Sequence, residues 1–222
     1  MFKRLQKLKN EYSHAILVVY FAFYLPWFLW LNEFTPTRPH ITEIYCKLDD
    51  LIPFNEWFVI PYYLWFAYIA LGYVFLLFNN RNDFIRMCIF LYTGMTTCLI
   101  IYTLFPNYQT LRVDYDTLGR NNILIEAIRY LQMGDTPHDV FPSIHCFNSI
   151  GMNIALWKNK WCKKHPWILV LVTLLTISIC LSTVFVKQHS ILDLFGAIGL
   201  AIPMYILAYV IPWKKLNKKA KS

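Results

Sequence analysis

The chain has 222 residues, of which 57% are apolar, 18% aromatic and only 15% charged; soluble domains average roughly 45 to 50% apolar and about 25% charged residues, so an ordinary soluble globular protein is excluded. The 7 glycines form neither a dinucleotide-binding fingerprint nor a phosphate loop, which excludes nucleotide-binding enzymes of those two classes. The formal net charge of +8 indicates a membrane protein rather than a nucleic acid-binding protein, because the cations gather at the two ends and in short connecting segments.

Six apolar windows, each near the length of about 20 residues that crosses a bilayer, follow one another along the chain. They cover residues 15–31, 57–78, 87–105, 141–157, 167–186 and 191–213. These windows predict an all-α integral membrane fold, in which a bundle of six transmembrane helices forms one catalytic domain over residues 1–222. The basic and then apolar residues 1–31 resemble a signal peptide, but the apolar part is bulky and has no small-residue cleavage site, so we expect a retained first helix.

Between the third and fourth windows the spacing predicts an extracytoplasmic amphipathic helix. Apolar residues recur at helical intervals, at Ile123, Leu124, Ala127, Ile128 and Leu131. Polar side chains lie mostly on the other face, and Gly134 and Pro137 would end the helix. Two interpretations of this helix stay open, namely a helix that lies on the membrane surface and a lid over a lipid site.

The distribution of Lys and Arg predicts the orientation of the bundle. Of the 21 Lys and Arg residues, 15 lie on the side of the amino terminus and six on the opposite side. The positive-inside rule therefore places both termini in the cytoplasm. The two longest connecting segments, residues 32–56 and 106–140, then lie outside. We accordingly expect a multi-pass protein of the cell membrane with an extracytoplasmic active site.

Three polar clusters lie at the predicted outer face, where ionisable groups are costly unless they have partners. Arg112 follows the third window, residues 141–145 open the fourth, and residues 182–193 join the fifth and sixth. Taken singly, each has a structural explanation, such as a snorkelling cation or an interfacial histidine. Their common depth favours a functional site. The remaining histidines have no comparable cluster of polar residues near them in the sequence and are expected at the surface: His14, His40, His138 and His165.

The spacings within the clusters suggest phosphoryl chemistry. His189 and Asp193 are four residues apart, so on a helix the carboxylate would accept a proton from one ring nitrogen and leave the other as a nucleophile. Arg112 and Lys187 would bind phosphate oxygens. His145 would be free to donate a proton.

The start of the fourth window predicts an anion site. Pro142 fits the first turn of a helix, whose free N–H groups attract an anion, and the Ser143 hydroxyl would add a donor. By contrast, the six cysteines predict no disulfide framework and no metal-ligand spacing. We expect neither a metal nor another cofactor.

At these residues the sequence resembles the phosphatidic acid phosphatase type 2 superfamily of membrane lipid phosphatases and phosphotransferases. Its third signature is Ser-Arg, five residues, His, three residues and Asp, and that spacing is kept by Ser182, Thr183, His189 and Asp193. Its second signature, Pro-Ser-Gly-His, is similar to residues 142–145.

The first signature of that family, Lys, six residues and Arg-Pro, is matched only at Arg112. Phe105 stands in place of the Lys and Val113 in place of the Pro. In the third signature, Thr183 replaces the Arg. We therefore expect Lys187, which lies near His189 in the chain, to supply the missing positive charge.

The resemblance implies a role for each matching residue. His189 would be the nucleophile that forms a phosphohistidine, Asp193 would orient it, and His145 would be the general acid for the leaving alcohol. The phosphate would be held by Arg112, Ser143 and the backbone of Ile144. To these we add Lys187 and Ser182 as our own expectation. The family needs no metal.

The resemblance implies a lipid phosphatase that hydrolyses a phosphomonoester or pyrophosphate at the outer leaflet. Its partners would be a phospholipid or polyprenyl phosphate substrate and membrane lipids, and not nucleic acid. One alternative is a headgroup phosphotransferase, because family members with Pro-Ser-x-His include enzymes similar to inositol phosphorylceramide synthases. Another is a proton-coupled transporter or membrane scaffold, since His, Asp and Lys in membrane spans also form relays.

Overall fold

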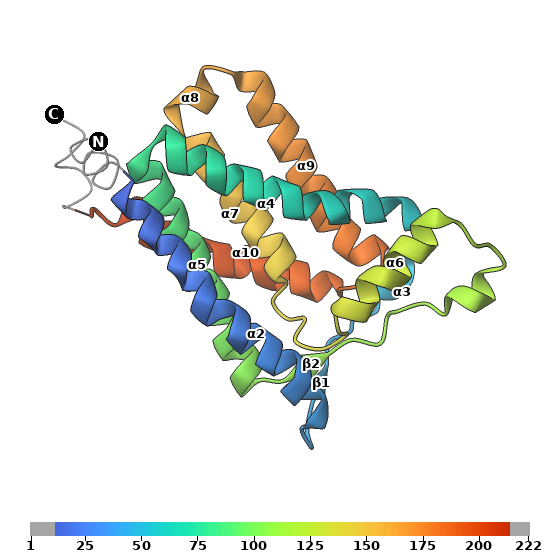
Figure 1. The fold of residues 1–222 in the computed structure, drawn as a ribbon. Coiled ribbons are helices and arrows are strands. Elements are labelled where there is room, and N and C mark those ends of the chain that lie inside the picture. The colour runs from blue at the N-terminus through green and yellow to red at the C-terminus, as the bar shows by residue number, and fades with distance from the viewer. Residues whose placement is uncertain (1–11, 214–222) are drawn as a thin grey trace, which may run out of the picture.

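The computed structural model describes residues 12–213, and these residues are mostly helical (Figure 1). The α-helices are α2 (Phe21–Phe34), α3 (Leu48–Leu51), α4 (Val59–Asn79), α5 (Arg81–Leu104), α6 (Ile123–Gly134), α7 (Ile144–Lys158), α8 (Lys160–Lys163), α9 (Pro166–Phe185) and α10 (Ile191–Tyr205). Short 3-10 helices cover Ser13–Tyr20, Thr35–Thr37, Glu56–Phe58 and Tyr115–Leu118, and a π-helical turn covers Ile206–Val210. The two short strands are β1 (Thr42–Glu43) and β2 (Asn107–Tyr108).

Within the described part of the chain, five helical segments are long and apolar enough to cross a membrane. They are Ser13–Thr37, Glu56–Asn79, Arg81–Leu104, Pro166–Phe185 and Ile191–Val210. Each coincides with one of the predicted windows, which makes the chain compatible with a multi-pass membrane protein. The helix at the fourth window, α7, has 15 residues. The basic tails that contribute to the predicted orientation, residues 1–11 and 214–222, lie outside the described residues.

Helix α7 lies at the centre of the bundle, in contact with α4, α5, α9 and α10 (Figure 1). It packs on α5, where Phe147 stacks on Phe90 with ring centroids 5.1 Å apart. A Cβ atom on Gly94 of α5 would lie 1.9 Å from the Phe147 ring, so only glycine leaves room for this packing. The central position of α7 fixes where its amino-terminal residues point.

The outward faces of the longer helices are apolar. Leu71 on α4, Trp167 on α9 and Ile202 on α10 are all more than half exposed. Extended exposed apolar surfaces mark contact with lipid or with another protein rather than with water. The exposed surface thus agrees with the composition of the chain.

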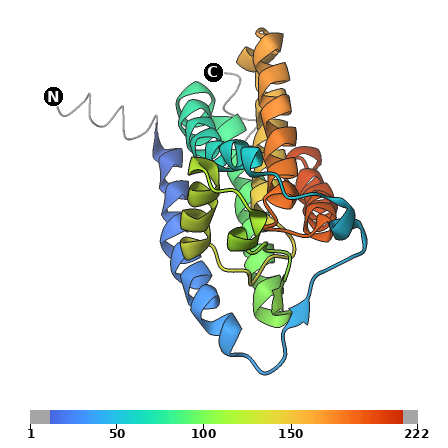
Figure 2. The same cartoon turned by 90° about the vertical axis from the view of Figure 1, so that its right-hand side faces the viewer.

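The two long connecting segments meet at one end of the bundle, which Figure 2 faces. Strand β1 pairs in parallel with β2, with Thr42 opposite Asn107. Helix α6 packs against the start of α4. There Glu56 accepts hydrogen bonds from Nε and Nη2 of Arg120 at 2.9 and 2.8 Å. The connecting segments therefore gather over the end of the bundle where α7 and α10 begin.

Two details differ from the expectations drawn from the sequence. The helix between the third and fourth windows is present as α6, but its fully buried residues are Ile125 and Ile128, whereas Ile123 is 83% exposed. The reason is that α6 packs sideways on residues of α4 such as Tyr62. His14 is not at the surface, because it is buried and its Nε2 lies 3.0 Å from the carbonyl oxygen of Leu77.

Candidate active site

The start of α10 holds the pair predicted from spacing. Nδ1 of His189 lies 3.0 Å from Oδ2 of Asp193, and both side chains are buried. His189 precedes the helix, because Ser190 is its N-cap. Asp193 also accepts the backbone N–H of Ser190 at 3.0 Å, as in a capping box. The pair forms because this capping carboxylate reaches back past the helix start, and not because both residues share a helical face.

Charge and burial act in opposite directions on His189. Burial alone would lower the pKa of its ring, since it disfavours the charged form. The hydrogen bond and negative charge of Asp193 nevertheless raise the pKa of His189 above its ordinary value. An aspartate that accepts from Nδ1 also leaves Nε2 as the unprotonated nitrogen of the neutral ring.

The start of α7 approaches this pair through the backbone. Ser143 is the N-cap of α7, with its Oγ accepting the N–H of Cys146 at 3.4 Å. Its own N–H donates to the backbone carbonyl of Asp193 at 3.2 Å. Pro142 precedes the cap rather than occupying the first turn, and the Phe141–Pro142 peptide bond is cis. Within residues 12–213, the N–H groups of Ile144 and His145 have no acceptor, as is usual in the first turn of a helix.

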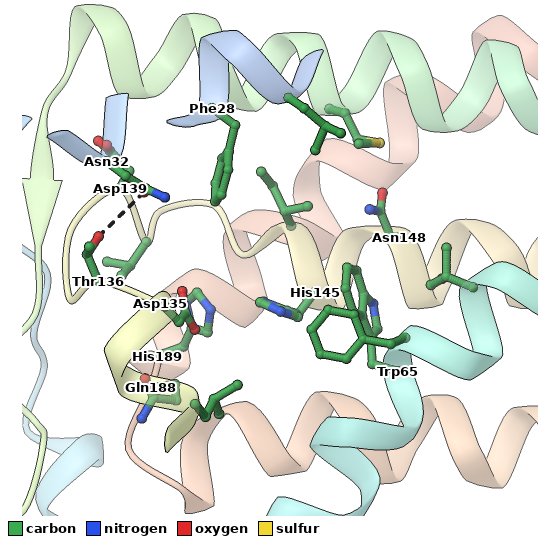
Figure 3. A pocket seen from close by; sticks show the side chains of 18 of the residues that line it. Phe28, Asn32, Trp65, Asp135, Thr136, Asp139, His145, Asn148, Gln188 and His189 are labelled. Carbon is green, nitrogen blue, oxygen red and sulfur yellow. Dashed lines mark hydrogen bonds between the residues drawn. The ribbon is translucent and has the colours of Figure 1, made fainter. Parts of the chain in front are cut away.

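His145, in the first turn of α7, faces His189. The centroids of the two rings are 5.8 Å apart and their planes meet at 63°. The His145 ring lies between Tyr62 at 4.8 Å and Trp65 at 4.5 Å, both from α4. Figure 3 shows the two histidines pointing toward one another across the cavity. The two predicted catalytic histidines are thus brought together from α7 and from the turn before α10.

Arg112 lies beside this site. Its Nη2 donates to the side-chain oxygen of Gln188 at 2.8 Å and to the backbone carbonyl of Asp135. Its Nε is buried and has no partner among the residues described. Burial lowers the pKa of the Arg112 guanidinium below its ordinary value. Asp135 in turn accepts the hydroxyl of Tyr62 at 2.8 Å, which connects the arginine to the ring that contacts His145.

Lys187 and Ser182 point elsewhere. The Lys187 ammonium donates to the backbone carbonyl of Asp49 at 2.7 Å. Its φ of +58° is a left-handed conformation that is unusual for a residue with a side chain. The Ser182 hydroxyl donates to the carbonyl of Ile179 within its own helix at 2.6 Å. The structure therefore does not bring these two side chains to the histidines.

A cavity of about 550 Å³ borders the two histidines. Its polar end is lined by Asp135, His145, Gln188 and His189, which Figure 3 labels. The remaining walls are largely aromatic and come from α2 and α4, with Leu131 and neighbours from α6. The cavity thus joins a polar end to an apolar interior. His138 lines it too and is half-buried, which corrects its expected place at the surface.

Asp49 is a site-supporting residue that the sequence did not reveal. Its carboxylate accepts the Ser190 hydroxyl at 2.7 Å and the N–H of Ile191 at 2.8 Å. These contacts hold the turn that carries His189 from a helix more than 100 residues earlier in the chain. Nothing local in the sequence signals such a long-range cap.

Asn107 performs a similar task for α7. Its Oδ1 accepts the N–H groups of Val140 and Phe141 at 2.8 and 2.9 Å. The side chain is fully buried, so the segment before α7 is pinned to strand β2. In the sequence, only the position of Asn107 directly after the third predicted window indicates that it lies near the site.

The side chains around the two histidines provide hydrogen-bond donors and a guanidinium group. Within residues 12–213, no group of three His, Cys, Asp or Glu side chains is arranged to hold a metal ion. All six cysteines are free. A nucleophile with an orienting carboxylate, a second imidazole opposite it and a nearby guanidinium together suit transfer of a phosphoryl group.

Comparison with known proteins gives one family. The family model for the PAP2 superfamily matches residues 105–217, about half of the chain, and this segment contains all three polar clusters. Neither the curated proteins nor the solved structures give a significant match.

We expect Asp193→Asn to lower the pKa of His189. The substitution removes the negative charge that now raises this pKa, so the ring stays neutral down to a lower pH. Titration of histidine-labelled protein by NMR, with the signal assigned from a His189→Ala sample, measures the shift. The exposed carboxylate of Asp116 provides a control, and Asp116→Asn should leave the pKa of His189 where it is. An unchanged pKa in Asp193→Asn would show that the contact does not govern the ring.

Proposed function

The chain belongs to the PAP2 superfamily, and from that membership and the geometry of the site we propose that it is a membrane lipid phosphatase that works through a phosphohistidine. Members of this superfamily are phosphatases and phosphotransferases, which supports an enzyme acting on a phosphorylated substrate over a transporter or scaffold. The proposed substrate is a phosphomonoester or pyrophosphate carried by a lipid. The observation that carries the proposal is the His189–Asp193 pair facing His145 at the polar end of one cavity.

The first proposed step forms the phosphoenzyme. Nε2 of His189 attacks phosphorus while the bond from phosphorus to the alcohol oxygen of the lipid breaks. His145 donates a proton to that oxygen, and Asp193 stabilises the positive charge that develops on the attacking ring. The rings of His189 and His145 both border the polar end of the cavity, with their centroids 5.8 Å apart, so both imidazoles face the space in which the phosphoryl group would bind.

The second proposed step releases phosphate. His145, now neutral, accepts a proton from a water molecule that attacks the phosphorus, and the bond to His189 breaks. Arg112 and the free N–H groups at the start of α7 bind the phosphoryl oxygens in both steps. The unpartnered Nε of Arg112 supports this role, because a phosphate oxygen would provide its missing acceptor. Since these groups supply the positive charge, the proposed reaction is independent of metal ions.

Transfer to a lipid alcohol is the second candidate reaction. Two cations of the family signatures are replaced by Phe105 and Thr183, which leaves Arg112 as the cation that binds the phosphate in the proposed site. A site with fewer cations binds a doubly charged phosphomonoester less strongly. A phosphodiester carries a single negative charge, so such a site suits a diester as the phosphoryl donor. Both reactions share the phosphoenzyme and differ only in the acceptor.

We further propose that α7 completes a six-helix bundle in the membrane, with both termini in the cytoplasm and the active site at the outer face. The exposed apolar faces of α4, α9 and α10 support a lipid environment. The unequal distribution of Lys and Arg in the sequence supports this orientation. Helix α6, which contributes Leu131 to the cavity wall, then lies over the lipid site as a lid.

We expect detergent-purified protein to release phosphate from short-chain phosphatidic acid in the presence of a chelator. His189→Ala should reduce release to background because the nucleophile is lost, and His145→Ala should lower kcat by roughly 10²- to 10⁴-fold, as for loss of a general acid. His40→Ala, at an exposed position, should leave the rate unchanged. Label that enters a lipid product only when an alcohol is added would establish transfer instead. Phosphate release that persists in His189→Ala would refute the phosphohistidine.

The orientation can be tested by reporter fusions. A reporter inserted in the segment 106–140 should read extracytoplasmic, while reporters at either terminus should read cytoplasmic, because the excess of cations lies on the side of the termini. Insertion after Gly119, where the chain is exposed in a turn, leaves the contacts of α6 intact. A cytoplasmic reading at this position would reverse the proposed topology.

A further inference from the structure

The carboxylate of Asp135 lies at the end of the cavity where the phosphate is proposed to bind. Asp135 is the C-cap of α6 and lines the cavity together with His145 and His189 (Figure 3). Among residues 12–213 its side chain makes no ion pair, and Arg112 donates to its backbone carbonyl instead. A carboxylate repels phosphate and is costly away from water unless a positive charge offsets it. Its position therefore calls for a positive charge nearby.

Tyr62 connects this carboxylate to His145. Its hydroxyl donates to Oδ2 of Asp135 at 2.8 Å, and its ring lies against the ring of His145 with centroids 4.8 Å apart. The Tyr62 side chain is buried, so it has little freedom to move. One tyrosine thus holds the carboxylate and the imidazole in a fixed relation to each other.

The ring of His145 lacks the direct partner that His189 has. Neither of its ring nitrogens makes a hydrogen bond within the described part of the chain, whereas Nδ1 of His189 contacts Asp193. The neighbours of His145 on α4 are aromatic rings, and such surroundings disfavour a charged imidazole. A general acid must nevertheless carry its proton when the substrate is bound.

The ionisable groups around His145 come from every element packed against it. They are Tyr62 and Tyr63 of α4, Tyr102 of α5, Tyr130 and Asp135 of α6 and its C-cap, Arg112, His138 and Asp139 of the connecting segment, Cys146 of α7, Cys180 of α9, and His189 and Asp193 at the start of α10. Of these described groups, Asp135 and His189 are the two whose charges act on His145. A negative charge stabilises a protonated ring and a positive charge destabilises it, which makes Asp135 the stabilising group.

We propose that Asp135 is a positioning residue whose carboxylate, held by Tyr62 at the end of α6, keeps the imidazole of His145 protonated for transfer to the leaving alcohol. This rests on the proposed function, in which His145 is the general acid. The protonated ring is then the positive charge that offsets the carboxylate when phosphate binds. Each catalytic imidazole would have its own aspartate, Asp193 by direct contact and Asp135 through Tyr62.

The proposal accounts for both proton movements of the reaction. In the first step the proton passes from His145 to the alcohol oxygen, which leaves a neutral ring beside the Asp135 carboxylate. In the second step the attacking water returns a proton to His145, and the same negative charge favours its acceptance. The carboxylate keeps its charge throughout and gains no proton itself.

The test compares two substrates that differ in their need for a general acid. Asp135→Asn removes the charge but keeps the shape and the backbone carbonyl that binds Arg112. We expect kcat/KM for short-chain phosphatidic acid to fall roughly tenfold at neutral pH, and the alkaline limb of its pH profile to move to lower pH. p-Nitrophenyl phosphate releases a phenolate that leaves without a proton, so its kcat/KM should not fall.

Two further variants separate charge from structure. Asp135→Glu retains the negative charge and should retain most of the wild-type ratio of kcat/KM between the two substrates. Asp116→Asn removes an exposed carboxylate of the same connecting segment and should leave the ratio unchanged. If Asp135→Asn does not fold, Tyr62→Phe, which removes only the hydroxyl that holds the carboxylate, serves in the same comparison. An equal loss on both substrates, or no loss on the lipid, would overturn the proposal.

A titration separates this proposal from the proposed function. NMR of histidine-labelled protein without substrate, with the signal assigned from a His145→Ala sample, should show the His145 ring half-protonated at a lower pH in Asp135→Asn than in the wild type. If the wild-type protein releases phosphate from neither substrate, the proposed function fails while this titration still decides the role of Asp135. If phosphate is released but the titration of His145 does not change, the role of Asp135 alone is refuted.

Discussion

The site depends on the hydrogen bonds of one buried residue, Asp193. Its carboxylate caps α10 through the N–H of Ser190 and also contacts Nδ1 of His189. Its backbone carbonyl accepts the N–H of Ser143, which brings the start of α7 to the start of α10. A carboxylate without water is costly unless it has such partners. The contacts that stabilise the buried Asp193 therefore also orient the imidazole of His189. They hold α7, which carries His145, next to the start of α10.

This arrangement needs support from outside the bundle, because both helix starts follow irregular chain. Asp49 holds the turn before α10, and Asn107 holds the segment before α7. Each is buried, so loss of one would leave backbone N–H groups unpaired, at a cost of about 1–3 kcal/mol per group. The two long connecting segments thus help to build the proposed active site as well as cover it.

Helix content and the histidine–aspartate pair could be predicted from the sequence because both depend on short-range spacing. Apolar windows located five long helices, and the interval between His189 and Asp193 indicated contact even though His189 lies outside the helix. The direction of Lys187 could not be predicted, since its left-handed backbone turns the side chain toward Asp49. The support from Asp49 could not be predicted either, because its contacts with Ser190 and Ile191 join segments more than 100 residues apart in the sequence.

The central claim is that the imidazole of His189 carries the phosphoryl group. A single-turnover reaction with radiolabelled phosphatidic acid, quenched in base and followed by peptide mapping, tests it most directly. The account predicts a phosphoryl group on residue 189 that is stable in base, labile in acid and absent from His189→Ala. Label on a different residue, or an acid-stable linkage, would contradict it.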